Sequence, residues 1–212
     1  ITLAGKSLKS ISSSSVLELS HLDILTEIID EFEISPSDKA TIFKYISEKN
    51  MHELTGFCNT LSIPHEKTEV LKTILTSNGT ATEVLASLNF VSKSETKSPA
   101  LLELQVLIQS LDEEIVDMLR IDFSVVSDIN YYNGIVFKGF IEGIPFAVLS
   151  GGQYDKLMKK MHRKSRAIGF AVYLDVLERL STHTNLENSC FCTSETKFPT
   201  KNIKNDTLSV LE

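Results

Sequence analysis

Tryptophan is absent from the 212-residue sequence, and cysteine and proline are scarce, at three and five residues. Cys58 is isolated, while Cys190 and Cys192 stand too close together for a typical disulfide framework. No second pair of cysteines is present to complete a zinc site. The sequence therefore indicates a reduced, cytoplasmic protein and gives no sign of a metal or another cofactor.

Long apolar runs and an excess of positive charge are also missing. The longest apolar runs, 144–149 and 167–174, are far shorter than the roughly 20 residues that cross a bilayer, so we expect no membrane partner. Lysine and arginine number 21 against 28 acidic residues, which gives a net charge of −7 and no overall attraction to phosphate backbones. The basic run at 159–166 is more typical of an exposed loop than of a nucleic-acid-binding surface.

Apolar residues make up 42 % of the sequence, which is ample for a packed core. In the first half they recur at helical spacing, and helix starts such as Ser35-Pro36 and Ser98-Pro99 divide them. This pattern predicts helices near residues 3–11, 21–32, 51–61, 65–76 and 80–89, and two more that begin at residues 36 and 99.

The second half of the sequence changes to strand patterns. We expect strands at residues 16–20, 121–127, 134–141, 144–149 and 168–173, helices at 154–161 and 174–180, and an edge strand around 190–192. Glu142-Gly143 would form a tight hairpin turn between two of these strands. A run of helices followed by adjacent strands indicates an α+β fold with a mainly antiparallel sheet.

Two adjacent tyrosines form the first candidate binding element. Tyr131 and Tyr132 follow Asn130 at the start of an expected strand, where neighbouring side chains would face opposite sides of the sheet. One tyrosine could then line a pocket, where its ring and hydroxyl would suit a flat, polar ligand ring, while the other supports it. The same spacing also fits two half-buried core tyrosines.

A glycine pair forms the second candidate element, in residues 150–155, which read S-G-G-Q-Y-D. Gly151 and Gly152 would let the backbone approach a ligand closely, although the pair could equally form a turn into a helix. The segment lacks the G-x-x-x-x-G-K-[ST] pattern of a phosphate loop. The five histidines fall in no metal-ligand pattern, and neither a G-x-S-x-G motif nor a Cys-His signature of a catalytic nucleophile is present.

Three segments in the second half share the order and spacing of motifs from a known family. Residues 127–137 read S-D-I-N-Y-Y-N-G-I-V-F, residues 151–157 read G-G-Q-Y-D-K-L, and residues 169–176 read G-F-A-V-Y-L-D-V. They resemble the R-G-L-D-Y-Y-T-G-I-V-F, G-G-R-Y-D-x-L and G-F-A-x-G-x-[DE]-R motifs of the histidyl-tRNA synthetase family. The resemblance is strong across 121–180 and looser across 16–118.

This resemblance implies a partial class II aminoacyl-tRNA synthetase-like antiparallel sheet with a helical insertion. The sheet domain would comprise residues 1–20 and 119–212. Residues 21–118 would form a helical block that is mostly the inserted domain of the family. The first two class II motifs have no counterpart in this sequence, so we expect further residues upstream.

The departures from the synthetase motifs remove positive charge. Ser127 replaces the arginine that the family uses on the carboxylate side of histidine activation, and Val176 replaces the arginine that holds the ATP triphosphate. Gln153 replaces a third arginine, and Tyr173 replaces a small residue, which would crowd a nucleotide. Neither serine nor valine can make the bidentate phosphate contact of a guanidinium. The resemblance therefore implies a histidine-shaped pocket without aminoacylation chemistry.

This combination resembles the regulatory subunit of short-form ATP phosphoribosyltransferase, a family of synthetase paralogues. The resemblance implies a non-catalytic subunit that is required for activity and for histidine feedback in the first step of L-histidine biosynthesis. It also implies a hetero-oligomer with the catalytic subunit, self-association as a dimer and L-histidine as the effector, with no tRNA. The implied histidine-binding residues are Asn130, Tyr131, Tyr132, Gly151, Gly152 and Tyr154.

Two other functions remain open at this point. A degenerate histidyl-tRNA synthetase-like aminoacyl ligase would need a triphosphate-binding arginine from elsewhere, and ATP–pyrophosphate exchange would reveal it. A synthetase-like sensor domain of another pathway, for instance in a kinase, would need further domains. The complete reading frame would show such domains.

Overall fold

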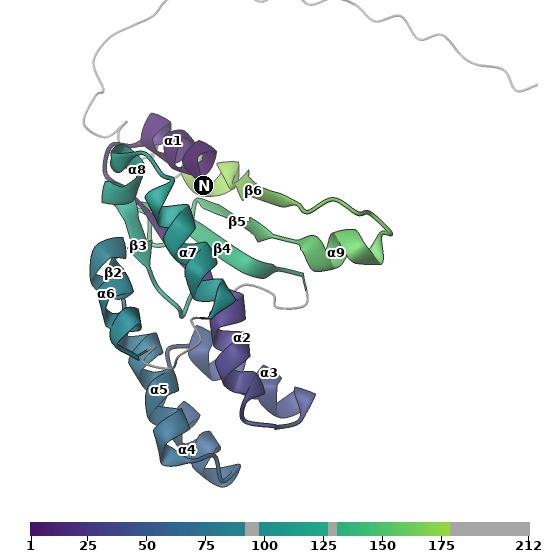
Figure 1. Cartoon of the computed structure of the whole chain (residues 1–212). Helices are drawn as coiled ribbons and strands as arrows, with labels where there is room; N and C mark the ends of the chain where they lie inside the picture. Colours follow the sequence, from purple (N-terminus) through teal and green to yellow (C-terminus); the bar gives the residue numbers. More distant parts are fainter. Residues whose placement is uncertain (92–97, 127–130, 179–212) are drawn as a thin grey trace, which may run out of the picture.

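The computed structural model describes residues 1–91, 98–126 and 131–178 (Figure 1). Its helices are α1 Thr2–Ile11, α2 Leu22–Asp30, α3 Pro36–Ser47, α4 Met51–Thr60, α5 His65–Thr76, α6 Ala81–Val91, α7 Pro99–Gln109, α8 Glu113–Met118 and α9 Asp155–Lys160. Its strands are β1 Ser15–His21, β2 Gly79–Thr80, β3 Leu119–Ile121, β4 Asn133–Ile141, β5 Leu149–Gln153 and β6 Ile168–Val172. Residues 174–178 are helical as well.

The described strands form one six-stranded sheet in the order β2-β3-β1-β4-β5-β6. β1 and β3 run parallel, and the other neighbouring pairs are antiparallel. The pairing of β1 with β4 extends from Ser15 opposite Ile141 to His21 opposite Ile135. The α+β fold with a mainly antiparallel sheet, predicted from the sequence, is therefore confirmed.

The helices lie in several places around the sheet (Figure 1). α1 and α8 lie together at one end of the sheet, and α7 crosses in front of its strands in this view. α3, α4 and α5 form a bundle beyond the opposite end, and α2 leads from the sheet into this bundle. β5, β6 and α9 project on the side away from α6.

Local signals in the sequence start two of these helices. The Ser35 side chain accepts a hydrogen bond from the backbone N–H of Asp38, with Pro36 in the first turn. The Ser98 side chain accepts one from the backbone N–H of Leu101 in the same way. Such caps satisfy backbone donors that have no partner within the helix. The predicted helix starts at residues 36 and 99 are confirmed.

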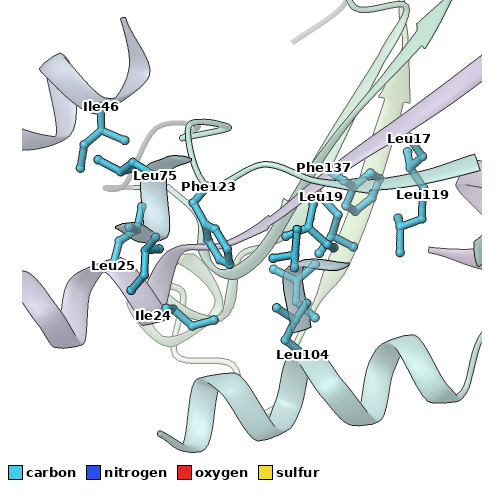
Figure 2. Close-up of a cluster of buried hydrophobic side chains, with 14 of the residues drawn as sticks. Leu17, Leu19, Ile24, Leu25, Ile46, Leu75, Leu104, Leu119, Phe123 and Phe137 are labelled. Carbon is cyan, nitrogen blue, oxygen red and sulfur yellow. The ribbon is translucent and has the colours of Figure 1, made fainter. Parts of the chain in front are cut away.

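A continuous apolar core joins the helices to the sheet (Figure 2). Leu17 and Leu19 of β1 are fully buried, and Leu104 of α7 packs in the same cluster. Phe123, also fully buried, lies in Figure 2 between the sheet side chains and those of the bundle, such as Ile46. Burial of this continuous surface fixes the bundle against the sheet.

The strand that follows the helical block lies earlier in the chain than predicted, at Leu119–Ile121, and is shorter. β3 ends at Ile121, whereas the expected strand covered 121–127. Asp122 begins a turn instead, because its Oδ1 accepts hydrogen bonds from the backbone N–H of Ser124 at 2.8 Å and from its hydroxyl at 2.6 Å. A side chain that accepts a hydrogen bond from a nearby backbone N–H in this way competes with strand pairing.

The strand predicted at 144–149 is displaced along the chain. β5 spans Leu149–Gln153, so residues 142–148 form a connection that is longer than a tight hairpin turn. This connection closes with a hydrogen bond from the Val148 N–H to the Gly139 carbonyl at 2.8 Å. The glycine pair therefore lies inside a strand and does not break it.

The other predicted helices and strands are present, with small shifts at their ends. β2 and α8 were not predicted as separate elements. The edge strand expected around 190–192 lies outside the described residues. Within the described part of the chain, no helix is both long and apolar enough to span a membrane.

Candidate functional site

An open cavity of about 310 Å³ lies where the turn before β4 meets β5 and β6. Its lining residues are Tyr131, Tyr132, Ser150, Tyr154, Gly169, Phe170, Ala171 and Tyr173. Five of these eight residues are aromatic, and none is an aspartate, glutamate, histidine, lysine or arginine. Segments that are distant in the sequence thus contribute aromatic rings to one concave surface, which is typical of small-molecule sites.

Both adjacent tyrosines of the predicted site line the cavity. They precede Asn133, the first residue of β4, so strand alternation does not send their side chains to opposite faces. The rings of Tyr131 and Tyr132 pack edge to face, with centroids 4.6 Å apart and an interplanar angle of 74°. The Tyr131 ring also lies 5.9 Å from that of Tyr154. The structure therefore places the two tyrosines side by side in the wall.

The environment of Tyr132 keeps its phenol protonated. Burial raises the pKa of Tyr132, and the nearby hydroxyls of Tyr131, Tyr173 and Tyr154 raise it further. A phenol has an ordinary pKa near 10, so a raised value leaves this hydroxyl uncharged at neutral pH. The Tyr132 side chain therefore offers a ring and a neutral hydroxyl to a ligand.

The glycine pair of the predicted site lies beneath the cavity wall. Gly151 and Gly152 are buried within β5 and are not among the lining residues. A Cβ atom at Gly151 would stand 2.3 Å from the carbonyl oxygen of Gly169, and one at Gly152 would stand 2.8 Å from Cδ1 of Tyr132. The pair thus allows β5 and β6 to pack closely and leaves room for the Tyr132 ring.

Gln153, at the position of a synthetase arginine, is a buried partner of the backbone. Its Oε1 accepts a hydrogen bond from the N–H of Ile135 at 2.7 Å. This bond lies at an irregularity in the pairing of β4 with β5, where Gly134 adopts a φ of +62° that favours glycine. Gln153 therefore completes the strand pairing and does not line the cavity.

Two further departures from the synthetase motifs have clear positions. Tyr173 lines the cavity, and its hydroxyl lies 2.5 Å from that of Ser150, within hydrogen-bonding distance. Val176 is partly buried and packs against the main hydrophobic core. Ser127 and the predicted binding residue Asn130 lie outside the described residues.

Ser150 and Phe170 line the cavity, although neither was predicted from the sequence as a site residue. Phe170 belongs to the third segment that resembles the synthetase motifs, so a signal for it was present. Its ring lies 6.4 Å from that of Phe137, which anchors the cavity wall in the core. Ser150 carried no separate signal, because its place at the cavity depends on the displaced start of β5.

Ion pairs connect the α9 side of the cavity to α7. The Arg166 guanidinium bonds Oδ2 of Asp155 at 2.9 Å and Oε1 of Glu103 at 3.2 Å. The other Asp155 oxygen accepts a hydrogen bond from the N–H of Ala167 at 2.8 Å. Burial alone would raise the pKa of Asp155, but these bonds hold it below its ordinary value. The basic loop is therefore tied to the fold at Arg166.

His21 lies at the inner end of this group of charges. It is fully buried, and its Nε2 is 3.5 Å from Oε2 of Glu103, although neither ring nitrogen has a hydrogen-bond partner. Burial lowers the pKa of His21 despite the opposing effect of Asp23 and Glu103. The described residues contain no group of three metal-ligating side chains. His21 is thus a neutral core residue.

Comparisons with known sequences agree on one family. A family model described as histidyl-tRNA synthetase matches residues 1–177. The chain is 28 % identical over 184 residues to the ATP phosphoribosyltransferase regulatory subunit of Oceanobacillus iheyensis, and 31 % identical over 159 residues to that of Carboxydothermus hydrogenoformans. These matches cover 86 % and 75 % of this chain but 45 % and 48 % of the relatives. The chain therefore spans about half the length of the curated relatives it matches.

Solved structures share the fold. An ATP phosphoribosyltransferase regulatory subunit/histidyl-tRNA synthetase from Bacillus halodurans matches with a TM-score of 0.74 and 23 % identity, over 84 % of this chain and 47 % of that one. Histidyl-tRNA synthetase from Nostoc gives 0.65 and 18 %, over 84 % and 44 %. An ATP phosphoribosyl transferase (HisG:HisZ) complex from Thermotoga maritima gives 0.58 and 16 %, over 79 % and 57 %. The predicted class II synthetase-like fold is confirmed.

Proposed function

This chain belongs to the histidyl-tRNA synthetase family, and we propose that it forms part of a non-catalytic regulatory subunit of ATP phosphoribosyltransferase. In this role the full-length subunit is required for the activity of the catalytic subunit and for histidine feedback in the first step of L-histidine biosynthesis. The names of the curated relatives support the proposal. They are about twice as long as the matched region, so the role concerns the full-length protein.

The position of Tyr173 is the observation that carries the proposal. Its side chain lines the cavity at a position where the synthetase motif has a small residue, and its hydroxyl lies within hydrogen-bonding distance of that of Ser150. Val176, at the position of the triphosphate-binding arginine, packs on the core. Activation of an amino acid with ATP depends on cations placed against the phosphates, so these two residues favour a binding role without that chemistry.

The proposed effector is L-histidine, bound in the tyrosine cavity. Tyr131, Tyr132 and Tyr154 would enclose the ligand, and the glycine pair of β5 would support the wall from behind. A flat imidazole fits against aromatic faces, and the tyrosine hydroxyls offer hydrogen bonds to its nitrogens. Feedback inhibition would follow if histidine binds the inhibited state of the assembly more tightly than the active state.

The proposed partners follow from the same role. They are the catalytic subunit of ATP phosphoribosyltransferase, in a hetero-oligomer, and a second copy of the regulatory subunit, in a dimer. The proposed location is the cytoplasm. tRNA is not a proposed partner, because the chain carries a net charge of −7 and Arg166 of its basic loop is already paired with carboxylates.

Reconstitution tests this function. The full-length protein and the catalytic subunit are purified separately and combined, and transfer of the phosphoribosyl group to ATP is measured with and without histidine. Activity should require both proteins and should fall as histidine is added. The same preparation, freed of contaminating synthetase, should show no histidine-dependent ATP–pyrophosphate exchange. Full activity of the catalytic subunit alone, or measurable exchange, would contradict the proposal.

A further inference from the structure

The tyrosine cavity presents ring faces without an accompanying charge. Tyr131 is 40 % exposed and Tyr173 is 39 % exposed, so both lining rings keep accessible surface. Tyr131 also stands between Tyr132 and Tyr154, with ring centroids 4.6 Å and 5.9 Å away. The face of an aromatic ring carries partial negative charge, so several rings around one space favour a positively charged group.

We propose that this cavity recognises its ligand through a cationic nitrogen and leaves the ligand carboxylate in solvent. The inference rests on the proposed function, in which the ligand is histidine, and it narrows the ligand class to imidazole-bearing amines. Histidine offers a cationic ammonium group, and its imidazole becomes a second cation when it is protonated. The carboxylate would contribute little to the affinity.

The lining residues give a carboxylate few partners. Carboxylates in proteins pair with guanidinium or ammonium groups, and none of the described lining residues carries one. Arg166 is already bonded to Asp155 and Glu103. The hydroxyls of Ser150 and Tyr173 lie within hydrogen-bonding distance of each other. The ring faces are therefore the main recognition surface that the cavity offers.

The Tyr132 hydroxyl stays uncharged near neutral pH. Burial raises the pKa of Tyr132, so this hydroxyl does not become a phenolate that would attract the cation directly. The cavity volume of about 310 Å³ suits a small ligand with a single ring. It lies near the lower end of the roughly 300–1,000 Å³ that small-molecule pockets occupy.

Three ligands that differ in charge test the inference by calorimetry on the full-length protein. L-histidine carries both charged groups, histamine lacks the carboxylate, and imidazolepropionate lacks the ammonium group. Histamine should bind within about threefold of histidine, and imidazolepropionate should bind at least about tenfold more weakly, the size expected for a desolvated cation–π contact. Equal or tighter binding of imidazolepropionate than of histamine overturns the inference, and so does failure of all three to bind.

Substitutions at Tyr131 separate the ring from its hydroxyl. Tyr131→Phe keeps the ring face and should retain the affinity for histidine and histamine. Tyr131→Leu removes the face and should weaken both by roughly five- to thirtyfold, while the weak binding of imidazolepropionate stays unchanged. Because Tyr131 is exposed, both variants should fold. The matched control is Phe146→Leu, which removes a half-exposed ring outside the cavity lining and should change none of the affinities. An equal loss of affinity in Tyr131→Phe and Tyr131→Leu would show that the hydroxyl, and not the ring face, recognises the ligand.

Failure of this inference can be told from failure of the proposed function. If the subunit activates its catalytic partner and responds to histidine but does not bind histamine, cation recognition is wrong and the proposed function stands. If histamine and histidine bind as expected but the protein activates no phosphoribosyltransferase, the proposed function is wrong and cation recognition stands.

Discussion

Two cavities of similar volume differ in how their polar groups are satisfied. The cavity between the helical bundle and the sheet, about 330 Å³, is lined by the ion pair of Lys49 and Asp122, whereas the tyrosine cavity, about 310 Å³, has no charged lining residue. Nζ of Lys49 lies 2.7 Å from Oδ2 of Asp122, and Ser124 bonds the other carboxylate oxygen. The charges of the first cavity are thus paired with each other, which indicates a structural role; this ion pair of Lys49 and Asp122, between the bundle and the sheet, is called the joint below. The rings of the second keep exposed faces, which suit a ligand.

The largest expected effect is a loss of stability on truncation of Phe123, in the core that connects the bundle to the sheet. Phe123→Ala removes a fully buried ring from the cluster that connects the bundle to the sheet. We expect the free energy of unfolding to fall by about 3–5 kcal/mol, as for other buried aromatic truncations. Urea unfolding followed by circular dichroism measures this. Tyr131→Ala, at the half-exposed cavity wall, should cost far less, and equal losses in the two variants would erase the distinction between joint and binding surface.

The next prediction concerns the binding surface. Tyr132→Ala removes aromatic contact and one hydrogen bond from the proposed histidine pocket, which should lower the affinity by about 1–3 kcal/mol. The histidine concentration for half-inhibition of the assembled phosphoribosyltransferase should therefore rise by about 5- to 150-fold. Assembly and basal activation should remain. A variant that assembles and keeps its histidine response, with Tyr131→Ala equally silent, would place the inhibitor elsewhere.

A change at the ion pair of Lys49 and Asp122 should instead lower the stability and leave the histidine response unchanged. Asp122→Asn keeps the bonds to Ser124 but removes the charge opposite Lys49, whose side chain is 65 % exposed. We expect unfolding at pH 7 to become easier by about 1–2 kcal/mol, with no change in the histidine response. Asp112→Asn, in an exposed pair with Lys6 at 3.8 Å, is the matched control and should have little effect. A shifted histidine response in Asp122→Asn would mean that the joint takes part in regulation.

The pH dependence of Asp122→Asn has a fixed sign. Burial would raise the pKa of Asp122, but its hydrogen bonds to Lys49 and Ser124 outweigh burial and hold the pKa below its ordinary value of 3.8. A carboxyl group with a lowered folded-state pKa contributes stability that is complete above the unfolded-state pKa and is lost as the pH falls through the folded-state pKa. The stability difference between wild type and variant should therefore shrink below about pH 4. A constant difference down to pH 2 would show that the charge is not its origin.

Features of the fold that depend on neighbouring residues could be predicted from the sequence, whereas those that depend on residues distant in the sequence could not. Helix starts at Ser35 and Ser98 depend on residues three positions away, so their signal is complete within one turn. The glycine pair of β5 appeared to be a chain break, because its structural cause lies in Gly169 and Tyr132, which are distant in the sequence. Apolar periodicity could not show that the Asp122 carboxylate would accept a hydrogen bond from the backbone N–H of Ser124 and begin a turn there.

The candidate site divides in the same way. Tyr131, Tyr132 and Tyr154 were predicted as site residues, and the structure brings their rings to one cavity. The position of Ser150 depended on where β5 begins, and the link from Arg166 to Glu103 spans 63 residues. Ion pairs between residues so far apart in the sequence cannot be predicted from local residue spacing. The third motif segment contains the lining residues of β6, because a family motif reflects which residues share a site in the folded protein.

The smallest expected effect is at Arg166, whose ion pairs connect the α9 side of the tyrosine cavity to α7. Arg166→Gln removes a guanidinium that connects Asp155, next to Tyr154 of the cavity wall, to Glu103 of α7. The Arg166 side chain is 68 % exposed, so water already screens this pair, and the urea midpoint should move less than in Phe123→Ala or Asp122→Asn. Any change should fade as salt is raised toward 1 M, where the screening length is about 3 Å. Glu103→Gln and the double variant complete a cycle that isolates the pairwise contribution. If Arg166→Gln leaves the histidine affinity unchanged, the cavity wall is held by strand packing alone. A salt-sensitive loss of affinity that Glu103→Gln reproduces would instead make this ion pair a link between α7 and the ligand.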